Sequence, residues 1–311
     1  MTYRNILIPI DGSYFAEAAL PYGKGLARAT GARLHLVMVH AQVPALIGMG
    51  ETPPLVELDE SSKEQERTYL AHLSGELLHE GLPMVEFREL EGPPGPVLCE
   101  EAERIDADLV IMATHGRGAM GRLWLGSVAD YMFRHLTTPV LLVHPDRLQP
   151  PAPPSFGSLL VSLDLSKDSQ VILEPVIRLA QVTQAHVTLV HVIEPVVGAV
   201  SLGMPFAAPI PVELFEEQRS TAQRKLDRIA DVLRDRGLSV SARLVDAANA
   251  AVGLLEKLED KRYDLIAMTT HGRGGVRRLL LGSVADKVIR GAAKPVLVVR
   301  PTTGDLSPSG V

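Results

Sequence analysis

The chain has 311 residues, of which 46% are hydrophobic and 22% charged, and its formal net charge is −6. This length suits about two domains of an ordinary globular protein. The acidic balance argues against binding to duplex nucleic acid, which requires a basic face, and the single cysteine, Cys99, permits no intramolecular disulfide and fits a reducing compartment.

Apolar periodicity predicts alternating strands and helices in the first half of the chain. Residues 4–10 form an apolar run typical of a buried parallel strand. This N-terminal segment lacks the features of a signal peptide, so we expect a cytoplasmic protein. A helix follows, with apolar positions from Ala16 to Ala27, and Gly31 ends it. The next elements are a strand at 34–39 and a helix that a capping box, Ser61 with Glu64, opens and Gly81 closes.

The remaining elements of the first half continue the alternation. They are a strand at 84–90, a short helix at 97–104, a strand at 109–113, a glycine-rich loop, a helix from Ser127 and a strand at 140–143. The second half has the same order. We therefore predict an α/β protein with two tandem, doubly wound, five-stranded parallel-sheet domains of Rossmann-like form.

The second half is a copy of the first. Residues 113–130 read ATHGRGAMGRLWLGSVAD, and residues 269–286 read TTHGRGGVRRLLLGSVAD. Because further matches occur in the same order along nearly the whole chain, a duplication explains them. We predict a first domain at 1–145, a Pro-rich linker at 146–156, a second domain at 157–301 and a polar tail at 302–311.

One uncharged stretch, Pro195–Val212, is long enough to suggest a membrane span. It contains four prolines and two glycines, which disfavour a helix. We interpret it as a loop and expect no membrane partner.

A ligand of a doubly wound sheet binds beyond the carboxyl ends of the strands, where the strand order reverses. Asp11 ends the first predicted strand, and the glycine loop from His115 follows the fourth. If these strands are neighbours, both elements face one crevice.

The glycine loop has the chemistry of an anion site. Gly116 and Gly118 let the backbone approach a ligand closely, and the pair Gly126-Ser127 opens a helix whose first amides have no partner within the helix. Arginines at 117 and 122 recur at 273 and 278 and could neutralise phosphate charge. The alternative is that Ser127 is only an N-cap, with Asp130 as its partner.

Two other nucleotide motifs are excluded. Residues 116–121, GRGAMG, match the dinucleotide fingerprint, but they follow the fourth strand rather than the first, and Arg277 breaks the match in the second copy. The P-loop pattern is absent from the sequence. We therefore expect neither a nicotinamide nor a flavin cofactor.

The loop spacing resembles the nucleotide signature of the universal stress proteins, G-x-x-G, nine residues, then G-[ST]. Gly116 is followed by nine residues and Gly126-Ser127, and Gly272 by nine residues and Gly282-Ser283. The similarity extends to IPIDGS at 8–13 and to the final strands, PVLLV and PVLVV. Both halves take part, so the chain resembles a tandem universal stress protein.

This resemblance implies ATP, together with Mg²⁺, as the ligand of each copy. It implies that the aspartate after strand one meets the adenosine end, that a residue ending strand two lines the adenine pocket, and that the loop holds ribose and phosphates. The implied nucleotide-binding residues are Pro9, Asp11, Val39, Ala113, His115, Gly116, Arg117, Gly118, Gly126, Ser127 and Val128, and Asp164, Val192, Thr269, His271, Gly272, Arg273, Gly274, Gly282, Ser283 and Val284. No protein side chain is expected to bind the metal. Asp11 could instead be a helix cap, and Val39 and Val192 plain core residues.

The copies depart from the family pattern in different ways. Ala113 and Thr269 replace the first glycine of the signature, and Leu165 stands where the first copy has Gly12. We expect the first copy to bind nucleotide more tightly, because Leu165 adds bulk and Thr269 resists positive φ.

The sequence thus predicts an ATP-binding stress-response or signalling module without catalytic residues. Two alternatives stay open: a protein-interaction scaffold that binds no nucleotide, and a slow ATP hydrolase with His115 or His271 as general base. We also predict self-association through the final strands, Val140–Val143 and Val296–Val299, as a homodimer or as a pair of domains within one chain.

Overall fold

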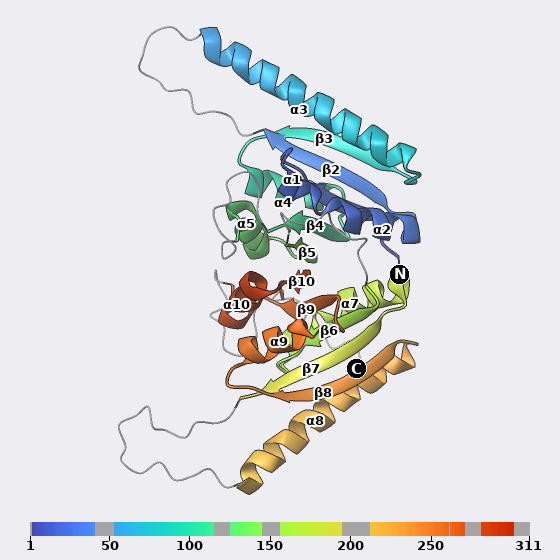
Figure 1. Ribbon diagram of the computed structural model, residues 1–311, viewed down its shortest axis with the longest axis vertical. Helices are drawn as coiled ribbons and strands as arrows, with labels where there is room; N and C mark the ends of the chain where they lie inside the picture. Colours follow the sequence, from blue (N-terminus) through green and yellow to red (C-terminus); the bar gives the residue numbers. More distant parts are fainter. Residues whose placement is uncertain are drawn as a thin grey trace, which may run out of the picture. The chain divides into compact units, whose positions relative to one another are not determined.

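The computed structural model describes residues 2–40, 53–114, 125–144, 156–194, 212–260, 262–270 and 281–301. The chain divides into two compact units, Met1–Pro154 and Ser155–Val311 (Figure 1). The first unit contains β1 (Asn5–Pro9), α1 (Tyr14–Glu17), α2 (Leu20–Thr30), β2 (Arg33–His40), α3 (Pro53–His79), β3 (Val85–Glu91), α4 (Pro94–Arg104), β4 (Leu109–Ala113), α5 (Ser127–His135) and β5 (Val140–Val143).

The second unit repeats this order. It contains β6 (Ser158–Ser162), α6 (Lys167–Gln170), α7 (Leu173–Thr183), β7 (His186–Ile193), α8 (Val212–Asp235), β8 (Ser239–Asp246), α9 (Ala250–Glu259), β9 (Leu265–Thr269), α10 (Ser283–Gly291) and β10 (Val296–Val299).

Each unit is a doubly wound parallel sheet. The strand order is β3-β2-β1-β4-β5 in the first unit and β8-β7-β6-β9-β10 in the second. The order reverses at β1 and β4, and right-handed crossovers therefore put α2 and α3 on one face and α4 and α5 on the other. The predicted fold class is confirmed.

A repeated aspartate ties the starts of two neighbouring strands together. Asp108, just before β4, accepts hydrogen bonds at Oδ2 from the backbone N–H groups of Arg4 and Asn5, at 2.7 and 3.0 Å. Asp264, just before β9, accepts one from the N–H of Ser158 at 3.0 Å. These bonds fix β1 beside β4 and β6 beside β9, which is the adjacency that the site requires.

The central strands supply the cores. Every residue of β4, β5, β9 and β10 is buried. Continuous apolar runs of this kind are expected where helices cover both faces of a parallel sheet. Cys99 is buried on α4, and burial raises the pKa of its thiol to about 11.

Two predicted helices differ from the structure. The helix predicted across Ala16–Ala27 is split into α1 and α2, because Pro21 lies in the first turn of α2 and cannot donate a backbone hydrogen bond to a preceding turn. The helix predicted to open at Ser61 begins at Pro53 instead, so the supposed capping box lies inside α3. Proline is well suited to a first helical turn, which explains the earlier start.

The predicted linker at 146–156, apart from Phe156, and the tail at 302–311 lie outside the described residues, as does the stretch Pro195–Val212 apart from its last residue. Of the helices in the described part of the chain, none is long and apolar enough to cross a membrane.

Candidate functional site

Three adjacent strands bring two predicted site residues, Asp11 and Val39, to one level with Thr114 at the carboxyl edge of the first unit. Asp11 follows β1, Val39 lies near the end of β2, and Thr114 follows β4. The parallel registers of β1 with β2 and β4, continued past the last paired residues, set these three positions side by side. The condition that the first and fourth strands be neighbours is therefore met.

The second unit repeats this arrangement. The registers of β6 with β7 and β9 set Asp164, Val192 and Thr270 at one level in the same way. Each unit thus has its own candidate crevice at the point where its strand order reverses, which is the position at which such sheets bind ligands.

The aspartate of each crevice organises the turn that follows its strand. Asp11 Oδ1 accepts a hydrogen bond from the N–H of Ser13 at 2.9 Å, and Ser13 Oγ in turn accepts one from the N–H of Ala16 at 3.2 Å. Ser13 is therefore the N-cap of α1. The alternative that Asp11 is the cap is wrong, because Asp11 instead holds the residue that caps.

Asp164 makes the same turn with one additional bond. Its Oδ1 accepts hydrogen bonds from the N–H and the hydroxyl of Ser166, at 2.9 and 2.6 Å, and Ser166 caps α6. Both aspartates are partly exposed.

Val39 and Val192 lie near the ends of their strands and are not fully buried. Val39 is partly exposed, whereas the five residues that precede it in β2 are buried. Val192 is partly exposed at the corresponding position of β7. Both valines thus offer apolar surface at the level of the aspartates.

A backbone hydrogen bond closes the base of each glycine loop. The N–H of Gly126 donates to the carbonyl oxygen of Thr114 at 2.9 Å, and the N–H of Gly282 donates to that of Thr270 at 2.8 Å. Thr114 and Thr270 are 2% and 1% exposed. The start of the following helix is therefore held against the end of the fourth strand of its unit.

The helices α5 and α10 begin without a side-chain cap. Gly126 and Gly282 are the N-cap residues, in extended conformation, and neither helix has a side-chain hydrogen bond at its cap. Ser127 and Ser283 are the first helical residues, followed by Val128 and Val284. The alternative that Ser127 is the N-cap with Asp130 as partner is wrong, because Asp130 instead pairs with Arg134 at 2.9 Å.

Ala113 and Thr269 are the last residues of β4 and β9, and both are buried. Neither has a positive φ, so the expected penalty for Thr269 in a left-handed conformation does not arise. The strain lies at Leu165 instead, whose φ is 64°, where Gly12 has a φ of 73°. Pro9 ends β1, and Ser162 ends β6.

Part of the predicted site lies outside the described residues. These positions are His115, Gly116, Arg117 and Gly118 in the first copy, His271, Gly272, Arg273 and Gly274 in the second, and the arginines at 122 and 278. The described residues on either side show where each loop leaves its strand and where the following helix begins.

Two features of the site escaped sequence reasoning. The carbonyl groups of Thr114 and Thr270 close the loops, and the only available signal was the repeated Thr-His-Gly. His40, 5% exposed at the end of β2 beside Val39, has Nδ1 at 2.9 Å from Glu66 Oε2 on α3. A histidine among apolar strand residues was the signal for this second feature.

Among the described side chains, no group of three His, Cys, Asp or Glu residues could hold a metal ion.

Fold and site together define a duplicated α/β protein with one candidate ligand position at the strand-order reversal of each sheet. The model of the universal stress protein family matches residues 2–144 and 155–300, which cover both units. The chain therefore belongs to the universal stress protein family.

Relatives with the same tandem organisation span nearly the whole chain. A universal stress protein from Mycolicibacterium smegmatis is 27% identical over 308 residues, which cover 96% of this chain and 98% of the relative. Another from Mycobacterium tuberculosis is 27% identical over 303 residues, covering 95% and 96%. The crystal structure of a universal stress protein from Archaeoglobus fulgidus matches with a TM-score of 0.69 at 18% identity, covering 97% of this chain and 98% of that one, and shares its fold.

Proposed function

We propose that the chain binds ATP, one molecule in the crevice of each unit, and acts as a stress-response or signalling module in the cytoplasm. The observation that carries the proposal is the convergence, at one edge of each sheet, of a turn-forming aspartate, a partly exposed valine and an uncapped helix start. Family membership supports the assignment of these parts to the adenosine and phosphate ends of one nucleotide.

The chemistry of the described residues fits an adenine nucleotide. The first amides of α5 and α10 have no acceptor within their helices, and the positive end of the helix dipole favours phosphate there. Glycine at the cap contributes no side chain that would compete for these amides. Val39 and Val192 offer apolar contact to a base, and Asp11 and Asp164 offer carboxylate oxygens to ribose hydroxyls.

Mg²⁺ would accompany the triphosphate, because this ion binds readily through substrate phosphate oxygens. The arginines of the two loops, at 117, 122, 273 and 278, would neutralise further phosphate charge. No described residue is assigned a catalytic role, and the protein is proposed as a binder rather than an enzyme.

Calorimetric titration of the full chain with ATP and Mg²⁺ tests the proposal, and we expect two sites per chain. Gly126→Val should weaken one site about tenfold, which corresponds to ~1.4 kcal/mol, because it puts a branched side chain at the helix start. A Cβ at Gly126 already lies 3.2 Å from the carbonyl oxygen of Thr114, so the backbone must also shift slightly.

Gly75→Val is the matched control, since a Cβ at this position on α3 has no heavy atom within 4 Å. It should leave both sites unchanged. Absence of ATP binding by the wild type would favour the nucleotide-independent scaffold, an equal effect of both variants would refute the phosphate placement, and multiple-turnover release of ADP would indicate a hydrolase.

A further inference from the structure

The two units share an arginine on the outer strand but differ in charge on the helix that follows that strand. In β3, Arg88 pairs in register with Val37, which pairs with Pro9 at the end of β1. In β8, Arg243 pairs with Val190, which pairs with Ser162 at the end of β6. Arg88 and Arg243 therefore occupy the same position in the two sheets.

In the first unit this arginine belongs to a closed ionic cluster. Glu101 on α4 is 3% exposed and accepts hydrogen bonds from Arg88 at 2.9 and 3.2 Å and from Arg104 at 2.7 Å to each oxygen. One carboxylate thus sits between two guanidinium groups, which is the charge-assisted arrangement that arginine favours.

In the second unit the carboxylate is replaced by a cation. Glu101 lies eight residues before the start of β4, and Lys257 lies eight residues before the start of β9. By the same count Asp260 replaces Arg104. Asp260 has its own partner in Arg262, at 2.6 Å. Within the described part of the chain, Arg243 and Lys257 have no hydrogen-bond or ion-pair partner, so two positive charges face the place that a carboxylate fills in the first unit.

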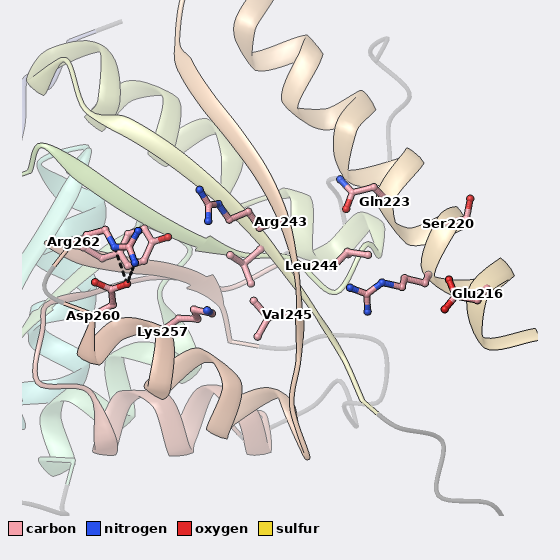
Figure 2. A pocket seen from close by; sticks show the side chains of 12 residues that line it. Glu216, Ser220, Gln223, Arg243, Leu244, Val245, Lys257, Asp260 and Arg262 are labelled. Carbon is pink, nitrogen blue, oxygen red and sulfur yellow. Dashed lines mark hydrogen bonds and ion pairs between the residues drawn. The ribbon is translucent and has the colours of Figure 1, made fainter. Parts of the chain in front are cut away.

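A groove of about 620 Å³ lies at these residues. Figure 2 shows Arg243, Lys257, Asp260 and Arg262 gathered on one side of β8, with residues of α8 such as Gln223 and Ser220 on the other. The side chains on the α9 side carry three positive charges and one negative charge. Arg219, on α8, is already paired with Asp246.

We propose that this groove is a second ligand site, which binds a small phosphorylated molecule by placing its phosphate group between Arg243 and Lys257. The doubly charged phosphate group matches these two cations, although the charge of Lys257 also acts on Asp260, where it helps to lower the pKa of the carboxyl, and the guanidinium fork of Arg243 suits two phosphate oxygens. The groove extends around β8 to both faces of the sheet, and the proposed phosphate position is the part on the α9 side, where Arg243 and Lys257 lie.

The proposed site differs from the nucleotide crevice by the charged residues at and after the end of α9, whereas Arg243 lies on β8 two residues before the level of Asp164 and Val192. The helix α9 starts at the carboxyl edge, after β8, and ends at the amino edge, before β9. Lys257, Asp260 and Arg262 therefore lie toward the amino edge, whereas Asp164 and the start of α10 lie at the carboxyl edge. This proposal does not depend on ATP binding.

Competitive labelling of lysines in the full chain tests the proposal. An acylating reagent should modify exposed Lys257, and inorganic phosphate at constant ionic strength should slow that modification. At twice its dissociation constant phosphate leaves a third of the site free, so the rate at Lys257 should fall about threefold. Lys225, exposed on α8 outside the groove, is the internal control and should keep its rate.

Variants identify the groups that hold the phosphate. Arg243→Gln should abolish the protection of Lys257, and Asp11→Ala and Asp164→Ala should retain it. Succinate in place of phosphate distinguishes a phosphate site from a site for any dianion. Equal protection of Lys225, no protection by phosphate, protection by succinate as strong as by phosphate, or loss of protection in the aspartate variants would each overturn the proposal.

Lys257→Glu provides a structural check, because it restores the charge pattern of the first unit. We expect this variant to melt at or above the temperature of the wild type, since the new carboxylate would pair with Arg243 as Glu101 pairs with Arg88. Lys225→Glu makes the same charge change outside the groove. If Lys257→Glu melts lower than Lys225→Glu, Arg243 does not face this position and the proposed site is wrong.

Discussion

Gly12 and Leu165 follow the crevice aspartates of the two units and adopt the same left-handed conformation, with φ of 73° and 64°. Such a conformation costs a residue with a Cβ about 1–2 kcal/mol, whereas glycine adopts it freely. Leu165 therefore introduces both strain and bulk beside Asp164. This difference supports tighter nucleotide binding in the first unit.

Exchanging these residues should exchange the properties of the two crevices. We expect Leu165→Gly to tighten ATP binding in the second unit and Gly12→Leu to weaken it in the first, because the side chain narrows the turn. Calorimetry of the full chain measures both. Gln184→Gly is the control: Gln184 also has a positive φ, 55°, but it caps α7 at the end away from the crevice. An unchanged affinity in Leu165→Gly would contradict the argument.

At the scale of elements, the Glu101 cluster joins α4 to the outer strand of the first sheet. Burial alone would raise the pKa of Glu101, but the hydrogen bonds from Arg104 and the charge of Arg88 outweigh it and hold the pKa below its usual 4.5. The unfolded chain therefore binds the proton more tightly. The stability that this carboxylate contributes is complete above pH 4.5 and is lost as the pH falls through the lower pKa of the folded state.

Glu101→Gln should lower the free energy of unfolding by about 1–2 kcal/mol near neutral pH, a modest value because both arginines are partly exposed. The difference from the wild type should shrink as the pH falls below 4.5. Urea unfolding at several pH values measures it. Glu103→Gln, exposed on the same helix, should show neither effect. A difference that stays constant with pH would mean that charge pairing is not the source.

At the scale of the whole molecule, β5 and β10 end the strand orders of their units and are short, apolar and buried along their length. Unpaired backbone groups at such a strand favour pairing with another strand. We expect self-association through these strands, either between chains or between the units of one chain. Light scattering and small-angle X-ray scattering over a range of concentrations measure this, and a monomer with separated units would contradict both forms.

Sequence reasoning succeeded where the pattern was local and continuous. The boundaries predicted for β4 and β5 match the structure, because both are unbroken apolar runs between turn residues. The predictions were wrong at the start of α3 and at the break after α1. Proline can lie in the first turn of a helix or follow a helix end, and the spacing of apolar residues does not distinguish these two positions. The loop closures by Thr114 and Thr270 use backbone atoms, which side-chain patterns do not reveal.

By itself, the sequence determined the duplication, the alternation of strands and helices, and the family signature, because these depend on residue identity, spacing and local conformational preference. Only the tertiary structure decided which residues meet. It set Asp11 level with Val39 and Thr114, moved the backbone strain from Thr269 to Leu165, and showed that Glu101 closes a cluster in one unit where Lys257 leaves Arg243 unpaired in the other. These contacts join segments far apart in the chain, and their energies depend on strand register and burial, which no local pattern encodes.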